Sequence, residues 1–182
     1  MRLSYSIPNK LWWIHDFLDQ ENYKGIHNAI FKERGKINLH SVEKEWNKTL
    51  YDNIKTMPER VGVSDYPPFE TLKNLIRKND IFTLPAGMDM NTNIHYLKKD
   101  SGINWHNDGG ATYGATWYLN RRWHPQWGGE FMFKDSAGHG FIPPTGNSLI
   151  LVKSPFEHKV NTVLSPLIPR ITVQLFMKAS TS

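Results

Sequence analysis

Apolar residues recur every three to four positions in two stretches near the start of the chain, and this spacing predicts amphipathic helices. The first stretch is "FLDQENYKGIHNAIFKERG", residues 17–35. Asp19 is placed to cap the helix and Gly35 to end it. The predicted apolar face consists of Tyr23, Ile26, Ile30 and Phe31.

The second stretch is "HSVEKEWNKTLYDNIKTMPE", residues 40–59, where Ser41 is the expected cap and Pro58 follows the expected end. Its apolar residues fall every four positions, at Val42, Trp46, Leu50 and Ile54. A shorter helix is expected from Pro68 through Ile76. The first 80 residues are therefore predicted to be helical.

After Asp80 the pattern changes to short apolar or alternating runs separated by Gly, Pro and Asn, which is typical of strands and turns. Seven strands are expected, at residues 81–85, 91–97, 111–119, 129–133, 148–152, 158–164 and 170–177. Their spacing favours a β-sandwich or barrel with the helices packed on one outer face. We expect one domain over 1–182, helical over 1–80 and β over 81–178.

Composition narrows the class of protein without identifying it. The chain has 182 residues, 39% hydrophobic and 21% charged, which suits a globular domain with a sizeable core. It has no cysteine, so disulfides, thiolate metal sites and a cysteine nucleophile are excluded. No secretory leader or membrane span is apparent, and a cytoplasmic protein is expected. The net charge of +5 is scattered, so a solvated basic surface is expected rather than a nucleic-acid face.

The segment "NWHNDGG", residues 104–110, is the first candidate for chemistry. In extended backbone His106 and Asp108 project to the same side, so they could bind a metal or only share a hydrogen bond. A metal site on a β-scaffold needs a third ligand from another strand, and His158 begins one. Two imidazoles and one carboxylate form the facial triad of non-haem Fe(II) oxygenases.

Arg170 opens the last apolar strand, "RITVQLFM", where a lone guanidinium needs an anion beside it. The carboxylate of a bound 2-oxo acid would provide that anion. The alternative is a structural ion pair with Glu130 or Asp135.

Taken together, the motifs of residues 96–177 resemble the catalytic domain of iron- and 2-oxoglutarate-dependent dioxygenases, most closely the prolyl 4-hydroxylase-like branch. The pieces that carry the resemblance are, in order, "WHND", "TWYLN", "WGGEF", "PPTGNSLILV", "PFEHKV" and "RITVQLF". The resemblance implies a double-stranded β-helix, a relative of the jelly roll and of the cupin fold, which agrees with the strand count.

The resemblance also implies roles for six residues. His106, Asp108 and His158 would be the iron ligands and the catalytic centre, and Arg170 would pair with the C5 carboxylate of 2-oxoglutarate. Tyr96 and Tyr118 match tyrosines that bind the cosubstrate; each could instead be a core or rim aromatic. The other histidines (His15, His27, His40, His95, His124 and His139) are interpreted as surface or satisfied residues, and Trp105 and Trp123 as candidates for the mouth of the site.

The expected activity is hydroxylation of an unactivated C–H bond, with Fe(II), 2-oxoglutarate and O₂ as cofactor and cosubstrates and ascorbate as an expected stimulant. A peptide, protein or small molecule is the expected substrate, and a peptidyl proline is the specific hypothesis. Two alternatives stay open. One is a non-catalytic metal- or ligand-binding β-barrel, and the other is a nucleobase demethylase, although Phe176 stands where those demethylases carry a second arginine.

Overall fold

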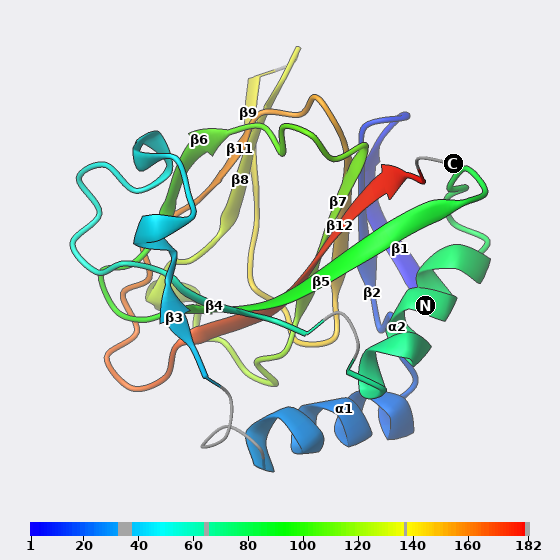
Figure 1. Cartoon of the computed structure of the whole chain (residues 1–182), viewed down its shortest axis with the longest axis horizontal. Helices are drawn as coiled ribbons and strands as arrows, with labels where there is room; N and C mark the ends of the chain where they lie inside the picture. Colours follow the sequence, from blue (N-terminus) through cyan, green and yellow to red (C-terminus); the bar gives the residue numbers. More distant parts are fainter. Residues whose placement is uncertain (33–37, 64–65, 137, 181–182) are drawn as a thin grey trace.

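A computed structural model of the chain describes residues 1–32, 38–63, 66–136 and 138–180. Two antiparallel sheets form its framework (Figure 1). The larger has the strand order β1-β2-β10-β7-β12-β5-β4-β3 and the smaller the order β6-β11-β8-β9. The strands of the larger sheet are β1 Arg2–Ile7, β2 Leu11–His15, β3 His40–Ser41, β4 Glu59–Gly62, β5 Met88–Leu97, β7 Tyr113–Tyr118, β10 Leu149–Lys153 and β12 Arg170–Ala179. Those of the smaller are β6 Ile103–His106, β8 Phe131–Asp135, β9 Gly138–Ile142 and β11 His158–Val160.

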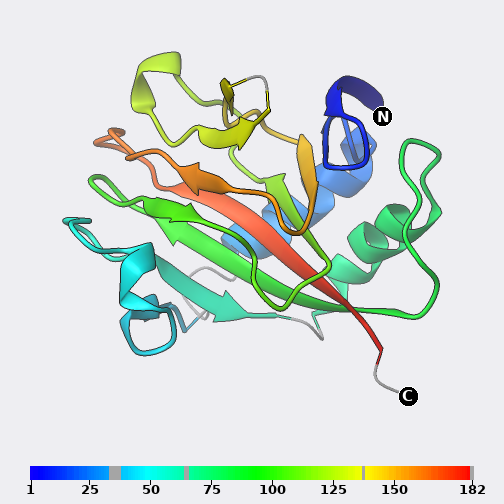
Figure 2. The same cartoon turned by 90° about the horizontal axis from the view of Figure 1, so that it is seen from above.

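The two sheets face each other, and Figure 2 shows the smaller one lying over one half of the larger. This is the double-stranded β-helix that the sequence predicts. The long strands β5 and β12 pair over their whole length and form the centre of the larger sheet. Successive side chains of β12 project to opposite sides, so the larger sheet has two different faces.

The outer face of the larger sheet is apolar and is covered by helices α1 Gln20–Lys32 and α2 Pro68–Lys78. The residues of β12 on this face join one core cluster with both helices: Ile171, Val173, Leu175 and Met177. Both helices lie on this side in Figure 1. The predicted packing of helices on one outer face is confirmed. The part of the chain that the structure describes holds no helix long and apolar enough to cross a membrane.

The first predicted helix is confirmed at its beginning, where the Asp19 carboxylate accepts a hydrogen bond from the Asn22 amide at 2.8 Å. Its predicted end at Gly35 lies outside the described residues. The helix predicted from Pro68 is also confirmed.

The helix predicted over residues 40–59 is wrong. The segment contains strand β3, two short 3₁₀ turns, η1 Val42–Lys44 and η2 Lys48–Leu50, and the first residue of β4. The Asn47 side chain accepts a hydrogen bond from the Thr49 amide and begins a new turn, so it competes with a continuous helix. The Asn104 side chain then donates to the carbonyls of Thr49 and Asp52, at 3.0 and 2.9 Å, and ties η2 to β6.

Two further expectations about the first part of the chain need correction. Residues 2–15 form the β1–β2 hairpin rather than helix, with Asn9 at a φ of 57° in the turn. Residues 81–85 form no strand, because Phe82 and Leu84 pack against the helix layer and pair with no neighbouring strand. The other six predicted strands are present, while β6, β9 and the four N-terminal strands were not predicted.

Candidate metal and cosubstrate site

The pairing of β6 with β11 brings two of the predicted ligands together. His106 lies directly opposite His158, and their ring centroids are 4.3 Å apart. The His158 ring also stacks on Phe131 of the neighbouring strand β8, at 4.9 Å between centroids. Both imidazoles are thus fixed by sheet register and by packing.

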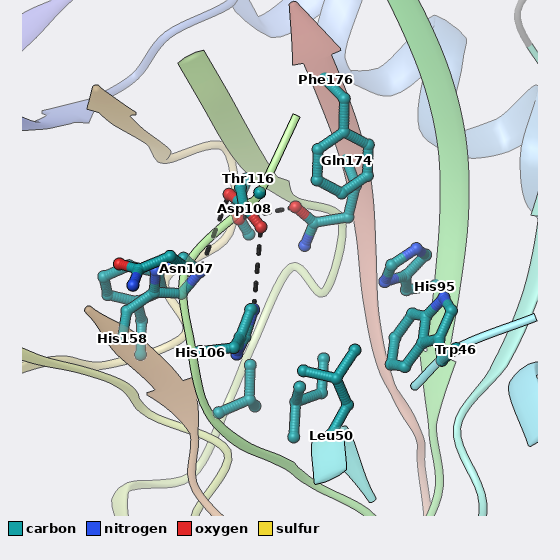
Figure 3. A pocket seen from close by; sticks show the side chains of 14 residues that line it. Trp46, Leu50, His95, His106, Asn107, Asp108, Thr116, His158, Gln174 and Phe176 are labelled. Carbon is teal, nitrogen blue, oxygen red and sulfur yellow. Dashed lines mark hydrogen bonds and ion pairs between the residues drawn. The ribbon is translucent and has the colours of Figure 1, made fainter. Parts of the chain in front are cut away.

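Asp108 reaches the same point from the loop that follows β6. Gly110, with a φ of 85°, lets the chain turn back at once, and the Ala111 amide donates to the Asp108 carbonyl at 3.1 Å. The Asp108 carboxylate lies 3.7 Å from Nε2 of His106 and 3.8 Å from Nε2 of His158. Figure 3 draws both contacts.

The histidine tautomers favour metal binding at this cluster. His106 Nδ1 lies 2.7 Å from the Asn104 carbonyl and His158 Nδ1 lies 2.8 Å from the Phe156 carbonyl. A carbonyl only accepts, so each Nδ1 carries the hydrogen and each Nε2 directs a lone pair at the cluster. Burial, followed by the neighbouring His158, lowers the pKa of His106 and keeps it a neutral ligand.

One atom from each of the three residues lies within 4.8 Å of the others. Bonds from a first-row metal ion to such ligands are about 2.0–2.2 Å long, so ligand atoms of one ion lie roughly 3–4.4 Å apart. The observed contacts of 3.7 and 3.8 Å fit that range. Two imidazoles and one carboxylate on one side leave the remaining positions of an octahedral ion open.

A cavity of about 210 Å³ opens beside the three ligands. Figure 3 shows the ligands on one side of it and His95 and Trp46 on the opposite side. Gln174 and Phe176 of β12 form the wall between them, and Thr116 donates a 2.8 Å hydrogen bond to Gln174. The space can hold a small organic molecule next to a bound ion.

Arg170 lies deeper than this cavity and is fully buried. Its Nε donates to the Gly129 carbonyl at 2.9 Å and its Nη2 to the Tyr118 hydroxyl at 3.1 Å. Burial raises the pKa of Tyr118, so this hydroxyl stays protonated. Nη1 has no partner, and no carboxylate pairs with Arg170 among the described residues. The structural ion pair with Glu130 or Asp135 is thus absent there, and a buried cation is left with an unpartnered nitrogen, Nη1, for an anion.

The predicted place of Tyr96 at the site is wrong. Tyr96 pairs with Ile171 across β5 and β12, and both side chains join the apolar cluster under the helices. Arg170 projects to the opposite, inner face of the same sheet, because successive residues of a strand alternate. Tyr118 is on the inner face, where its hydroxyl accepts a hydrogen bond from Arg170, and its role in binding the cosubstrate stays a prediction.

His95 is the residue of β5 that faces the cavity, and its interpretation as a surface or satisfied histidine is wrong. It is 3% exposed, and neither ring nitrogen has a partner in the described part of the chain. The polar alternation Asn91, Asn93, His95 along the strand was a signal that could have identified this face.

The prediction that Trp105 and Trp123 line the mouth of the site is also wrong. Neither Trp105 nor Trp123 lines the cavity. Trp105 lies under the ammonium of Lys134, 4.3 Å from the ring centroid, and the Trp123 indole donates to the Gly128 carbonyl at 2.8 Å. Trp46 and Leu50, which the sequence pattern predicts to lie in a helix, line the cavity instead.

Comparison with protein families matches residues 92–178 to the 2OG-Fe(II) oxygenase superfamily. This range includes all six residues that the sequence singled out. Comparison with curated proteins finds no match.

Solved structures share the fold at low sequence identity. A prolyl-4-hydroxylase from Pseudomonas putida is 13% identical, with a TM-score of 0.72 over 96% of this chain and 95% of that one. An oxidoreductase of the 2OG-Fe(II) oxygenase family from Burkholderia pseudomallei is 15% identical, with a TM-score of 0.71 over 100% and 95%. A prolyl hydroxylase from Trichoplax adhaerens, solved with a peptide fragment of the hypoxia inducible factor oxygen degradation domain, is 16% identical, with a TM-score of 0.66 over 93% and 84%.

Proposed function

We propose that the chain hydroxylates an unactivated C–H bond of a peptidyl proline, because its residues 92–178 match the 2OG-Fe(II) oxygenase superfamily. The overall reaction converts 2-oxoglutarate, O₂ and R–H into succinate, CO₂ and R–OH. The observation that carries the proposal is the convergence of His106, Asp108 and His158 on one point beside a cavity.

In this proposal the three side chains hold Fe(II) through two imidazole nitrogens and one carboxylate oxygen. The bound metal, with 2-oxoglutarate and O₂, supplies the oxidising chemistry. The protein positions the reactants and keeps water from them. The carbonyls of Asn104 and Phe156 orient the imidazoles through their Nδ1 hydrogens.

Arg170 binds the distal carboxylate of 2-oxoglutarate with its remaining donor, Nη1. The Tyr118 hydroxyl and the Gly129 carbonyl fix the guanidinium in place before the ligand arrives, so little rotamer entropy is lost on binding. Gly129, with a φ of 73°, leaves room for this arginine, since a Cβ atom there would lie 3.0 Å from its Cδ.

A proline substrate is supported by the apolar part of the cavity lining and by the similar solved structures. Trp46 and Leu50 give the cavity an apolar wall across from the three ligands, which suits a pyrrolidine ring better than a charged side chain. Two of the similar solved structures are prolyl hydroxylases. We further propose that residues 1–182 act as one domain, since α1 and α2 share a core cluster with β12.

The test is succinate release with three substrate sets: proline-containing peptides, free amino acids and methylated oligonucleotides. We expect succinate to form with a proline peptide, together with the mass increase of one oxygen atom. The same peptide with alanine in place of proline is the matched control. Turnover with the alanine peptide or with an oligonucleotide alone would contradict the proline assignment.

A further inference from the structure

His95 is a buried polar side chain whose hydrogen-bonding groups are unused. It lies at 3% exposure in β5, and both ring nitrogens lack a partner among the described residues. Buried polar groups are nearly always hydrogen-bonded, because an unsatisfied one costs about 1–3 kcal/mol. The position is therefore suited to a ligand that offers the imidazole a hydrogen bond.

The sheet register places His95 between the cavity and Arg170. His95 pairs with Thr172, and the next pair on the same face is Leu97 with Arg170. Diagonal neighbours of this kind have their Cβ atoms roughly 7–8 Å apart, within reach of long side chains. His95 lines the cavity, whereas Arg170 lies beyond it. Arg170 also has an unpartnered nitrogen, Nη1, so these two neighbouring residues both have donor groups without a partner among the described residues.

The ring of His95 is held in a defined orientation by Trp46, at 5.4 Å between centroids. Its surroundings also keep it neutral. Burial, with Arg60 and Arg170 nearby, lowers the pKa of His95 to about 3. A neutral imidazole carries one N–H donor, so it can bind an anion without adding a second buried charge.

We propose that His95 is a cosubstrate-binding residue whose imidazole N–H donates a hydrogen bond to the distal carboxylate of 2-oxoglutarate, which it shares with Nη1 of Arg170. This inference rests on the proposed function. Tyr96, the tyrosine that the family resemblance implied for cosubstrate binding, cannot reach the same ligand because its side chain is on the helix-covered face. In this chain His95, the residue before Tyr96, therefore has this cosubstrate-binding role.

The experiment is calorimetric titration of 2-oxoglutarate into the full chain loaded with Mn(II), in the absence of O₂, so that no turnover is needed. His95→Phe keeps a ring against Trp46 but removes both nitrogens. We expect its Kd for 2-oxoglutarate to rise about tenfold or more, the effect of losing a hydrogen bond to a charged group. His95→Asn keeps a donor and should recover part of the affinity. Tyr96→Phe, on the opposite face of the same strand, is the matched control and should leave the Kd unchanged.

A second ligand tests which part of the cosubstrate His95 contacts. 2-Oxobutyrate keeps the metal-chelating end but lacks the distal carboxylate, so its Kd should be the same in wild type and His95→Phe. An unchanged Kd for 2-oxoglutarate in His95→Phe overturns the inference. An equal loss of affinity for 2-oxoglutarate and 2-oxobutyrate overturns it as well. If His95→Phe does not fold, judged by its thermal unfolding midpoint, the same two comparisons are made with His95→Asn and His95→Gln. If the wild type itself binds no 2-oxoglutarate, the proposed function fails instead.

Discussion

The Asp108 carboxylate lies against the backbone of Gly114, in space that a Cβ atom at position 114 would fill. Gly114 is a residue of β7 on the inner face of the larger sheet, opposite Phe176 of β12. The carboxylate therefore depends for room on the strand that follows its own loop. Glycine at this position has a packing role beside the candidate metal centre.

Gly114→Ala should weaken metal binding without unfolding the protein, because the new methyl group displaces the Asp108 carboxylate from the cluster. Changes beside a metal ligand typically cost about 10–100-fold in affinity, and we expect a loss in that range. Co(II) titration followed by its visible absorption measures it. The control is Gly62→Ala in β4, where a Cβ atom meets only the Asn93 side chain, at 3.8 Å. Equal Co(II) affinity in wild type and Gly114→Ala would show that the contact is unimportant.

His158→Ala should lower the rate of iron-dependent decarboxylation of 2-oxoglutarate by more than about a hundredfold. The loss of a direct metal ligand costs more than the loss of a group that only orients a ligand. Circular dichroism should still show a folded β protein. His139→Ala, a histidine on the exposed edge strand β9, is the control and should keep full activity. Near-normal decarboxylation by His158→Ala would mean that the three residues are not the metal centre.

Arg170→Lys should raise the KM for 2-oxoglutarate by about tenfold or more while leaving Co(II) affinity nearly unchanged. An ammonium cannot donate at once to Gly129, to Tyr118 and to a carboxylate as the guanidinium fork can. Tyr118→Phe should have a smaller effect in the same direction, because it frees Nη2 and loosens the guanidinium. Initial rates of succinate formation measure both variants. A KM equal to that of wild type in Arg170→Lys would assign the arginine a purely structural role.

Acid should destabilise the protein partly through His95. Its pKa is lowered by burial to about 3, so between about pH 6.5 and 3 the unfolded chain binds a proton there that the folded chain does not. The free energy of unfolding therefore falls as the pH drops through this window, by up to about 1.4 kcal/mol per pH unit from this group. Urea unfolding at pH 7 and pH 5 should show a smaller decrease for His95→Phe than for wild type. If the free energy of unfolding falls by the same amount in both proteins, the His95 imidazole already has a hydrogen-bond partner in the folded state.

The sequence predicted the parts of the site that depend on strand alternation and residue type. His106 and Asp108 project together because they are two residues apart, and His158 and Arg170 are polar residues at the start of apolar strands. These features locate the metal centre without knowledge of which strands pair. Tyr96 was misplaced because a strand's alternation shows two faces but does not say which one is turned to the site.

The cavity wall that includes Trp46 and Leu50 could not be predicted because tertiary contacts override the local pattern there. Val42, Trp46 and Leu50 repeat at helical spacing, but in the structure Val42 belongs to η1, Leu50 to η2, and Trp46 lies between the two turns. The Asn104 side chain, which is distant in sequence, donates to the carbonyls of Thr49 in η2 and of Asp52 just after it, which a helix would otherwise use. Periodicity alone carries no information about such a partner.

The most direct test of the central claim is an anaerobic titration of the Fe(II)-loaded protein with 2-oxoglutarate, followed by visible absorption. Chelation of Fe(II) by the 2-oxo acid at an open three-ligand site should produce a weak charge-transfer band that saturates at one equivalent. The band should be absent in His158→Ala. A wild-type protein that binds Fe(II) but shows no such band on addition of 2-oxoglutarate would contradict the assignment of this site.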